Sequence, residues 1–284
     1  MPRRATGFTL LAPSQTGVTF SNTVSESLLV QNRTLADGAG VCLADVDGDG
    51  RPDVFFARTE GPNALYRNLG SWRFADITAS AGVAAPDRFS TGCAFADVDG
   101  DGDADLILVS MGGPNALFVN DGAGHFSERR AEAGLASTAG STTLALADVD
   151  GDGDLDLYVT NYKAYTTLDR MPPQERSFES VTRPVGRGYE VREQYRREYR
   201  VVDRPDLGGF SVEQRADPDF FYRNDGTGHF VREFIAHNPR FTDERGKELS
   251  AEPEDFGLAA TFSDLSGDGT FAEVARFAGV GGSG

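Results

Sequence analysis

The sequence contains 284 residues, of which 39% are hydrophobic, and carries a formal net charge of −17. This apolar content is enough for a core in one or two domains, while the acidic surface argues against nucleic acids and anionic membranes as partners. Glycine is abundant (34 residues) and methionine scarce (3), which favours strands and tight turns over helices. No run approaches the ~20 apolar residues of a membrane-spanning helix.

The N-terminal segment, residues 1–37, is irregular in pattern and contains one predicted strand, residues 17–20, as a candidate closing strand. The apolar run at residues 8–12 is too short for the core of a signal peptide. A secreted form of the protein would therefore need a leader that this sequence does not show.

The region 38–284 is periodic. The aspartates Asp45, Asp97 and Asp148 recur at steps of about fifty residues, and turns and hydrophobic runs keep the same phase. Each unit has the pattern strand, acidic loop, strand, turn, strand, Asp-Gly or similar hairpin, strand, which predicts four antiparallel strands, as in a propeller blade. We therefore predict an all-β, partial β-propeller with three blades at about 38–83, 90–135 and 141–235, and a degenerate fourth at 256–280.

The acidic loops carry the chemistry. In the third loop, Asp148–Asp156, a carboxylate stands at every second position, and such crowded charges repel one another unless a cation binds. Ca²⁺ suits them because it takes roughly 6–8 oxygen ligands in a flexible shell. We expect side-chain ligands at positions one, three, five and nine, a backbone carbonyl at position seven, and a sharp bend at the glycine in position six. The predicted metal residues are Asp45, Asp47, Asp49, Arg51 and Asp53 in the first loop, Asp97, Asp99, Asp101, Asp103 and Asp105 in the second, and Asp148, Asp150, Asp152, Asp154 and Asp156 in the third, for about three Ca²⁺ ions.

An EF-hand loop begins in the same way, but it closes with a glutamate at position twelve and lies between two helices. Here position twelve is apolar, at Phe56, Leu108 and Val159, and the flanking runs are rich in β-forming residues. The pattern therefore predicts calcium loops that join strands.

Two parts of the chain depart from the repeat. An insert at 163–218, rich in Arg, Glu and Tyr, interrupts the third unit; it is either a solvated, salt-bridged excursion or a partner-binding loop. In the last unit, Asp264 opens a loop-like stretch, but Ser266 and Ala272 take positions three and nine. We predict no strong metal site there and interpret residues 266–280 as a hairpin and a last strand.

The acidic loops, together with the hairpins Asn120–Phe126 and Asn224–Phe230, resemble FG-GAP/VCBS-type repeats over roughly residues 38–162 and 219–280. The resemblance implies an integrin-α-like β-propeller with calcium in its hairpin loops, close to the group that includes cartilage acidic protein and proteins with an ASPIC/UnbV domain, although that domain is not visible here. A ring of seven blades, as the family implies, needs more chain. We therefore expect a fragment, an internally deleted product, or an open or small propeller.

Other reactive residues point to structural roles. Cys42 and Cys93 are expected on opposite faces of equivalent strands, as small core residues rather than a disulfide. His125 and His229 occupy equivalent hairpin positions, and neither they nor His237 belongs to a pattern of nucleophile and base. We predict no catalytic and no cofactor-binding residues beyond the metal ligands.

The leading functional hypothesis is a non-catalytic, calcium-binding propeller that mediates protein or glycan interaction or adhesion. We expect it outside the cell, in the periplasm or at the cell surface, where calcium is plentiful. The alternatives are a propeller-type enzyme acting on polysaccharide, a lectin, or a non-functional fragment of a longer repeat protein. A lectin would repeat exposed aromatic residues between blades, but Trp72 is matched only by Gly124 and Gly228.

Overall fold

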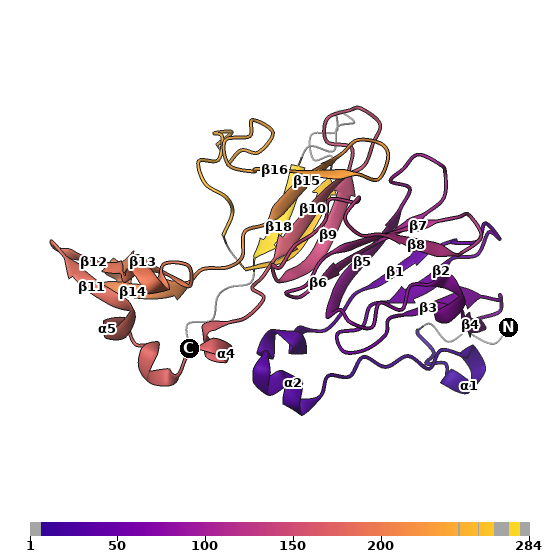
Figure 1. Cartoon of the computed structure of the whole chain (residues 1–284), viewed down its shortest axis with the longest axis horizontal. Helices are drawn as coiled ribbons and strands as arrows, with labels where there is room; N and C mark the ends of the chain where they lie inside the picture. The colour runs from indigo at the N-terminus through magenta and orange to yellow at the C-terminus, as the bar shows by residue number, and fades with distance from the viewer. Residues whose placement is uncertain (1–6, 244, 255, 264–272, 279–284) are drawn as a thin grey trace.

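A computed structural model describes residues 7–243, 245–254, 256–263 and 273–278 of the chain, which form three four-stranded and three two-stranded antiparallel sheets (Figure 1). The prediction of an all-β fold with four-stranded blades is confirmed. The first blade consists of β1 (Val41–Ala44), β2 (Asp53–Phe56), β3 (Ala64–Asn68) and β4 (Phe74–Asp76), and the second of β5 (Ser90–Ala96), β6 (Asp105–Ser110), β7 (Ala116–Asn120) and β8 (Phe126–Arg129). The third blade consists of β9 (Ser141–Ala147), β10 (Asp156–Asn161), β15 (Phe220–Asn224) and β16 (Phe230–Glu233).

The three blades share one register. The residue before each acidic loop pairs with the aspartate in position nine: Ala44 with Asp53, Ala96 with Asp105, and Ala147 with Asp156. Each loop therefore connects the first strand of its blade to the second. Since the strands alternate in direction, the hairpin between the third and fourth strands lies at the same end of the blade.

The hydrophobic core lies between successive blades. Leu106 and Leu108 of β6 face the first blade, where they pack with Phe55 and Leu65, whereas Ile107 on the same strand packs with residues of the third blade. Every residue of β6 is buried because both faces of the middle sheet are covered. This explains the unbroken apolar run in the sequence at that strand.

The inner strands approach closely. A Cβ atom on Gly92 of β5 would lie 2.7 Å from the backbone oxygen of Thr142 on β9, and one on Gly40, just before β1, would lie 3.1 Å from the Cα atom of Gly92. Only glycine allows these neighbouring first strands to pack at this distance.

The outer face of the third blade is covered less completely. Tyr158, Phe221 and Ile235 are buried there; the half-buried Phe241 and Leu249 that cover them come from the connection that follows β16, and Ala260 and Phe262 come from the strand after it. Two short strands follow, β17 (Gly257–Ser263) and β18 (Glu273–Ala278).

The last two strands pair with each other. From the sequence we expected the first strand of this unit to run directly into a hairpin and a last strand at 266–280, and β18 pairs directly with β17, with Ser263 opposite Glu273. This is the place that the second strand takes in the three blades. The prediction that Asp264, Ser266 and Ala272 form no strong metal site falls outside the described residues.

The predicted strand at 17–20 is wrong: these residues follow the short helix α1 (Pro13–Thr16) and belong to no strand. Gly17 ends the helix with a φ of 82°, and a Cβ atom there would lie 2.4 Å from the backbone oxygen of Phe74. Gly82 and Gly134 make the same approach to Phe126 and Phe230 of the following blades, at 3.0 and 2.0 Å. The N-terminal segment therefore reproduces the contact by which the end of one blade meets the next.

Further along this segment, the ring of Phe20 stacks on Phe56 with centroids 4.8 Å apart, and the backbone N–H of Thr19 donates to the hydroxyl of Tyr66 at 3.2 Å. The chain then forms α2 (Glu26–Gln31) and the 3-10 helix η1 (Arg33–Asp37) before it enters β1; the remaining helix of the blades, α3 (Thr78–Ala81), follows β4.

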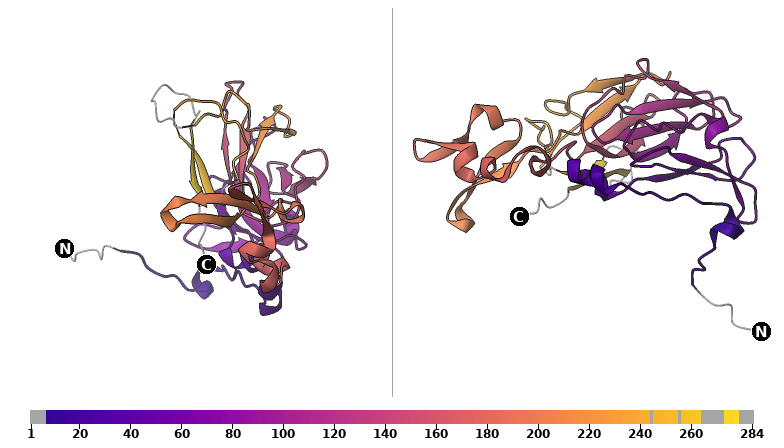
Figure 2. Two further views of the ribbon diagram at one scale, coloured as in Figure 1. Left: turned by 90° about the vertical axis from the view of Figure 1, so that its left-hand side faces the viewer. Right: turned by 60° about the horizontal axis from the view of Figure 1, so that its bottom comes forward.

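The insert at 163–218 extends away from the blades (Figure 2). It contains α4 (Thr167–Arg170), η2 (Pro173–Glu175), α5 (Phe178–Val181), β11 (Thr182–Val185), β12 (Gly188–Val191), η3 (Glu193–Tyr195), β13 (Tyr199–Arg204), η4 (Pro205–Leu207) and β14 (Gly209–Gln214). Val181, Val191 and Tyr199 form its own small buried core. Asp217, at the end of the insert, accepts the backbone N–H of Ala164 at its start at 2.9 Å and that of Gly140, just before β9, at 2.8 Å. These two bonds connect the ends of the insert to each other and to the third blade.

None of the helices in the described part of the chain has the length and apolar character needed to cross a membrane.

Candidate metal centre

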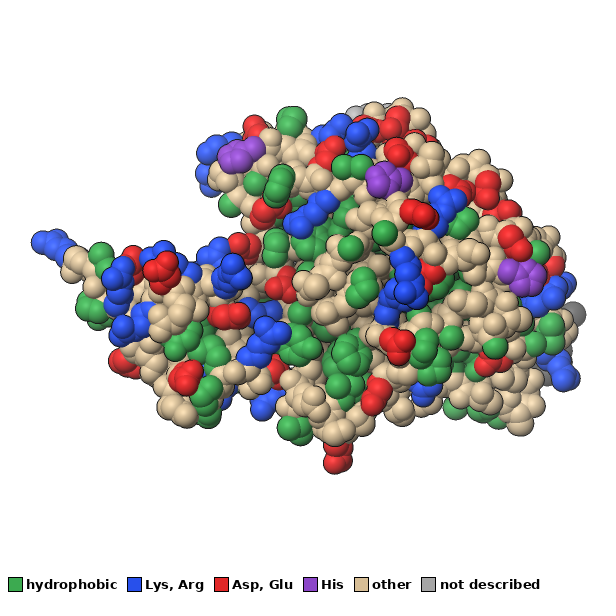
Figure 3. All heavy atoms as spheres, in the orientation of Figure 1, with side chains coloured by type: hydrophobic (Ala, Val, Ile, Leu, Met, Phe, Trp, Pro, Cys, Tyr) green, Lys and Arg blue, Asp and Glu red, His purple; other side chains and the backbone are tan. Residues whose placement is uncertain are grey.

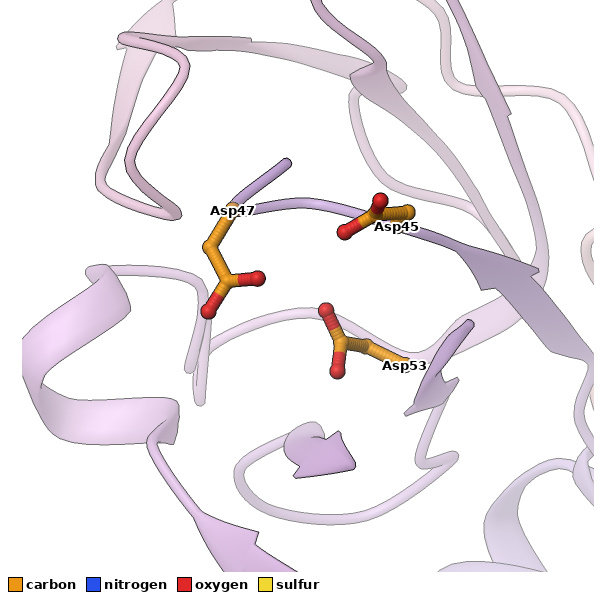
Figure 4. Close-up of side chains that lie close together, drawn as sticks. All are labelled: Asp45, Asp47 and Asp53. Carbon is orange, nitrogen blue, oxygen red and sulfur yellow. The ribbon is translucent and has the colours of Figure 1, made fainter. Parts of the chain in front are cut away.

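Each acidic loop brings three carboxylates together. The three groups are Asp45, Asp47 and Asp53, then Asp97, Asp99 and Asp101, and then Asp148, Asp150 and Asp152; within each group, one oxygen from every residue lies within 4.8 Å of the others. In the first loop the three side chains point toward a common centre (Figure 4). Oxygens around an ion with bonds of roughly 2.3–2.6 Å must lie within about 5 Å of one another, so this spacing fits a calcium shell.

The backbone of the loop holds the first carboxylate in place. Asp97 accepts N–H groups from Gly100 and Gly102 at 2.8 and 3.0 Å, and Asp148 accepts those of Gly151 and Gly153 at 2.7 and 3.1 Å. The glycines in position six take left-handed backbone, with φ of 93° at Gly102. The loops are therefore bent around the first aspartate by their own hydrogen bonds.

The aspartates in position nine have a second role. Asp105 is fully buried and accepts two backbone N–H groups, one from Val98 at 3.2 Å and one from Asn120 at 2.9 Å. Asp53 and Asp156 make the same pair of bonds in their blades. These carboxylates tie the acidic loop to the end of the third strand, which the spacing alone did not indicate.

Burial raises the pKa of all three position-nine carboxyls, and the pKa values of Asp105 and Asp156 rise to about 6. The two backbone hydrogen bonds oppose this shift, and the neighbouring loop carboxylates add to it. A cation in the loop would favour the ionised forms.

The aspartates in position seven of the second and third loops lie outside the three-carboxylate groups. A Cβ atom on Gly122 would lie 2.5 Å from a carboxylate oxygen of Asp103, and one on Gly226 would lie 2.6 Å from Asp154. Both aspartates thus lie against the hairpin of their own blade. Their side chains do not reach the place where an ion would bind. That the backbone carbonyl of position seven is a ligand remains a prediction.

The carboxylates in position three each meet an arginine. Asp47 pairs with Arg67 at 2.6 Å, Asp99 with Arg129 at 3.0 Å, and Asp150 with Arg240 at 3.5 Å, although these arginines come from different places in the repeat. The side chain of Asp99 is only 10% exposed, and its Oδ1 atom has no hydrogen-bond partner among the described residues. A buried carboxylate oxygen without a partner is costly, and a cation would satisfy it.

The first two loops are also in contact with the next blade. The side-chain amide of Asn120 donates to the backbone oxygen of Val46 at 3.0 Å, and that of Asn224 donates to Val98 at 2.8 Å. Arg129 adds a bond of 2.6 Å to the backbone oxygen of Thr227. From the sequence we interpreted these hairpin asparagines as turn residues. Only their recurrence before each Asp-Gly turn could have suggested that they also bind the preceding blade.

The histidines and cysteines lie elsewhere. His125 contacts the carboxylate of Asp121 at 3.1 Å, and His229 contacts the backbone oxygen of Glu132 at 2.6 Å, both on exposed hairpins. The thiols of Cys42 and Cys93 are free, and both pack against the core between the first two blades. The two side chains point toward opposite faces of their blades, so that each faces the blade of the other. Burial raises the pKa of the Cys42 thiol.

Comparisons with known proteins agree with this geometry. Residues 45–108 and 97–159 match the FG-GAP-like repeat family. The chain is 33% identical over 129 residues to cartilage acidic protein 1 of Mus musculus, which covers 44% of this chain and 20% of that protein. It is 31% identical over 127 residues to cartilage acidic protein 1 of Homo sapiens, covering 44% of this chain and 19% of that protein. The chain thus spans about a fifth of the length of these curated relatives.

Proposed function

Because this chain is an FG-GAP repeat protein that resembles cartilage acidic protein 1, we propose that it is a non-catalytic, calcium-binding β-propeller protein. The observation that carries the proposal is the second loop, where three carboxylates converge and the buried Oδ1 atom of Asp99 has no partner among the described residues. The proposed ligands in each loop are the aspartates in positions one, three, five and nine and the backbone carbonyl of position seven. Carboxylate and carbonyl oxygens are the donors that suit Ca²⁺.

The proposed role of the ions is structural. The loops join the inner strands, and the first two contact the hairpin of the following blade through Asn120 and Asn224. An ion that gathers the loop carboxylates offsets their repulsion and stiffens this contact. Calcium binding would then raise the stability of the blade stack as a whole.

We further propose that the protein acts outside the cell, where calcium is plentiful, and that it binds a protein or glycan ligand. The insert supports a recognition role, since Tyr189 and Phe210 are 43% and 37% exposed and their rings lie 5.6 Å apart. The projecting insert carries basic and acidic side chains interspersed on the face drawn in Figure 3. Exposed aromatic and arginine side chains are the types that dominate binding energy at interfaces.

Calorimetric titration of chelator-treated protein with Ca²⁺, paired with thermal melts, tests the proposal. We expect saturable binding in the loops and a rise in Tm. The double variant Asp99→Asn, Asp101→Asn should lose one site. The control Asp121→Asn, which removes an exposed hairpin carboxylate outside the loops, should bind as the wild type does. Absence of binding heat together with an unchanged Tm would overturn the proposal.

A further inference from the structure

The first acidic loop differs from the other two in its charge balance. It has four carboxylates, and two of them, Asp47 and Asp49, pair with two guanidinium groups, Arg51 from the loop itself and Arg67 from β3. The second and third loops each have five carboxylates and one paired arginine, Arg129 or Arg240. The first loop is therefore the least negative of the three.

The two arginines lie against the carboxylates of Asp47 and Asp49. Arg67 places its Nε atom 2.6 Å from Asp47 Oδ2 and its Nη2 atom 3.6 Å from Asp49 Oδ2. The guanidinium of Arg51 pairs with the same Oδ2 atom of Asp49, and its Nε atom donates to the backbone oxygen of Asn68 at 3.0 Å. The contact between Arg51 and Asp49 is a charge-assisted hydrogen bond, one of the stronger kinds in proteins, whereas Arg67 and Asp47 form an ion pair.

The converging carboxylates also differ between the loops. Position five belongs to the set in the second and third loops, as Asp101 and Asp152, whereas in the first loop Asp53 of position nine takes this place and Asp49, which pairs with both arginines, lies outside the set. In the other loops the single arginine is shared: Arg129 also donates to Thr227, and Arg240 also pairs with Glu233 at 3.2 Å.

We propose that the first loop is a weak calcium site, because Arg51 and Arg67 already neutralise its carboxylates, and that the second and third loops fill first. This inference rests on the proposed function. An ion entering the first loop must displace guanidinium groups from Asp47 and Asp49 and meets less negative charge, and the affinity of such loops depends on their ligand charge. At limiting calcium, two ions bind rather than three.

The chain itself supplies the matched variants. Asp103 and Asp154 stand where the first loop has Arg51, and Val119 stands on β7 where β3 has Arg67. Arg51→Asp together with Arg67→Val therefore gives the first loop the five carboxylates and the strand residue of the second, and it leaves the first loop without a paired arginine, whereas the second keeps Arg129. Arg223→Val is the control, since Arg223 has the same strand position in the third blade but pairs with Glu233 at 3.2 Å.

Calorimetric titration with Ca²⁺ in a calcium-buffered solution gives the readout. In the wild type we expect two tight sites and a third at least about tenfold weaker. The double variant should bind all three ions with similar affinity, and Arg223→Val should behave as the wild type. Arg51 and Arg67 are 45% and 44% exposed, so melts in chelator should show a folded variant.

A second measurement keeps the test independent of the double variant. In the wild-type background, Asp45→Asn should remove only the weak binding phase, whereas Asp97→Asn should remove a tight one. Three equal sites in the wild type, or loss of a tight site in Asp45→Asn, would overturn this inference and leave calcium binding intact. Absence of any binding in the wild type would instead overturn the proposed function.

Discussion

The junctions behind the first two acidic loops differ from the surroundings of the third. Behind the first and second loops, a neighbouring blade supplies both a core and an asparagine, Asn120 or Asn224, that binds the backbone of the loop. Beside the third loop, Val149 packs against a smaller cluster, which Phe241 and Leu249 of a connecting segment cover together with Ala260 and Phe262 of β17. The same loop sequence thus lies in two environments, so the spacing of its aspartates specifies possible ligands but not the support around them.

The largest expected effect is a difference in the free energy of unfolding when a leucine is removed from each of the two environments. Leu117→Ala, in the fully buried core between the second and third blades, should lower the free energy of unfolding by about 3 kcal/mol, because the cavity cannot collapse between packed sheets. Leu249→Ala removes the same atoms from the half-buried face of the third blade and should cost roughly 1 kcal/mol. Urea denaturation of the two variants measures the difference, and equal losses would contradict the comparison.

The hairpin asparagines should show the next largest effect. Asn120 is buried, donates to Val46 and Ala104, and accepts bonds from its own hairpin. Asn120→Ala should cost about 2 kcal/mol, because it leaves buried carbonyls without a donor. Asn68→Ala, at the matching position of the first blade, breaks bonds within that blade only and should cost about 1 kcal/mol. Similar losses in urea denaturation would mean that the inter-blade bond carries little stability.

Calcium should act unequally on the two environments. Asp97→Asn and Asp148→Asn remove the same carboxylate from the second and third loops, where each accepts two N–H groups of its loop. In saturating Ca²⁺, Asp97→Asn should lower Tm by a few degrees more, since a difference of about 1 kcal/mol shifts Tm by about 2–4 °C in a chain of this size. In chelator the two variants should melt at similar temperatures, and a gap that persists there would not be due to the ion.

The smallest effect is a pH dependence that the second and third loops should share. Without calcium, the folded pKa of about 6 for Asp105 and Asp156 lies above the ordinary value of 3.8. Protonation of these groups therefore stabilises the fold below pH 4, and this contribution is lost as pH rises through about 6. A bound cation favours the ionised forms, so the Tm difference between calcium and chelator should widen from pH 4 to pH 6. Asp105→Asn and Asp156→Asn should reduce this widening equally; unequal changes would show that the environments differ at position nine as well.

Several features of the fold could be predicted because they depend on neighbours in the sequence. The alternation of aspartate and glycine indicated a bent acidic loop, and the short β-rich runs on either side indicated strands. The structure confirms both the strands and the four-stranded sheets. The predicted strand at 17–20 was wrong because Gly17 is held against Phe74 in a contact between distant segments, although Thr16-Gly17-Val18 resembles Ala81-Gly82-Val83.

The repeat, the all-β class and the convergence of carboxylates in each loop can be read from the sequence, since they follow from local spacing and from chain reversal at glycine. The side chains that surround those carboxylates become known only when the blades are stacked. Arg129 and Arg240 reach the second and third loops from outside them, and Asn120 reaches the first loop from the following blade. The physical reason is that charge pairing and burial depend on distance in space, and stacking the blades brings together residues that the chain separates widely.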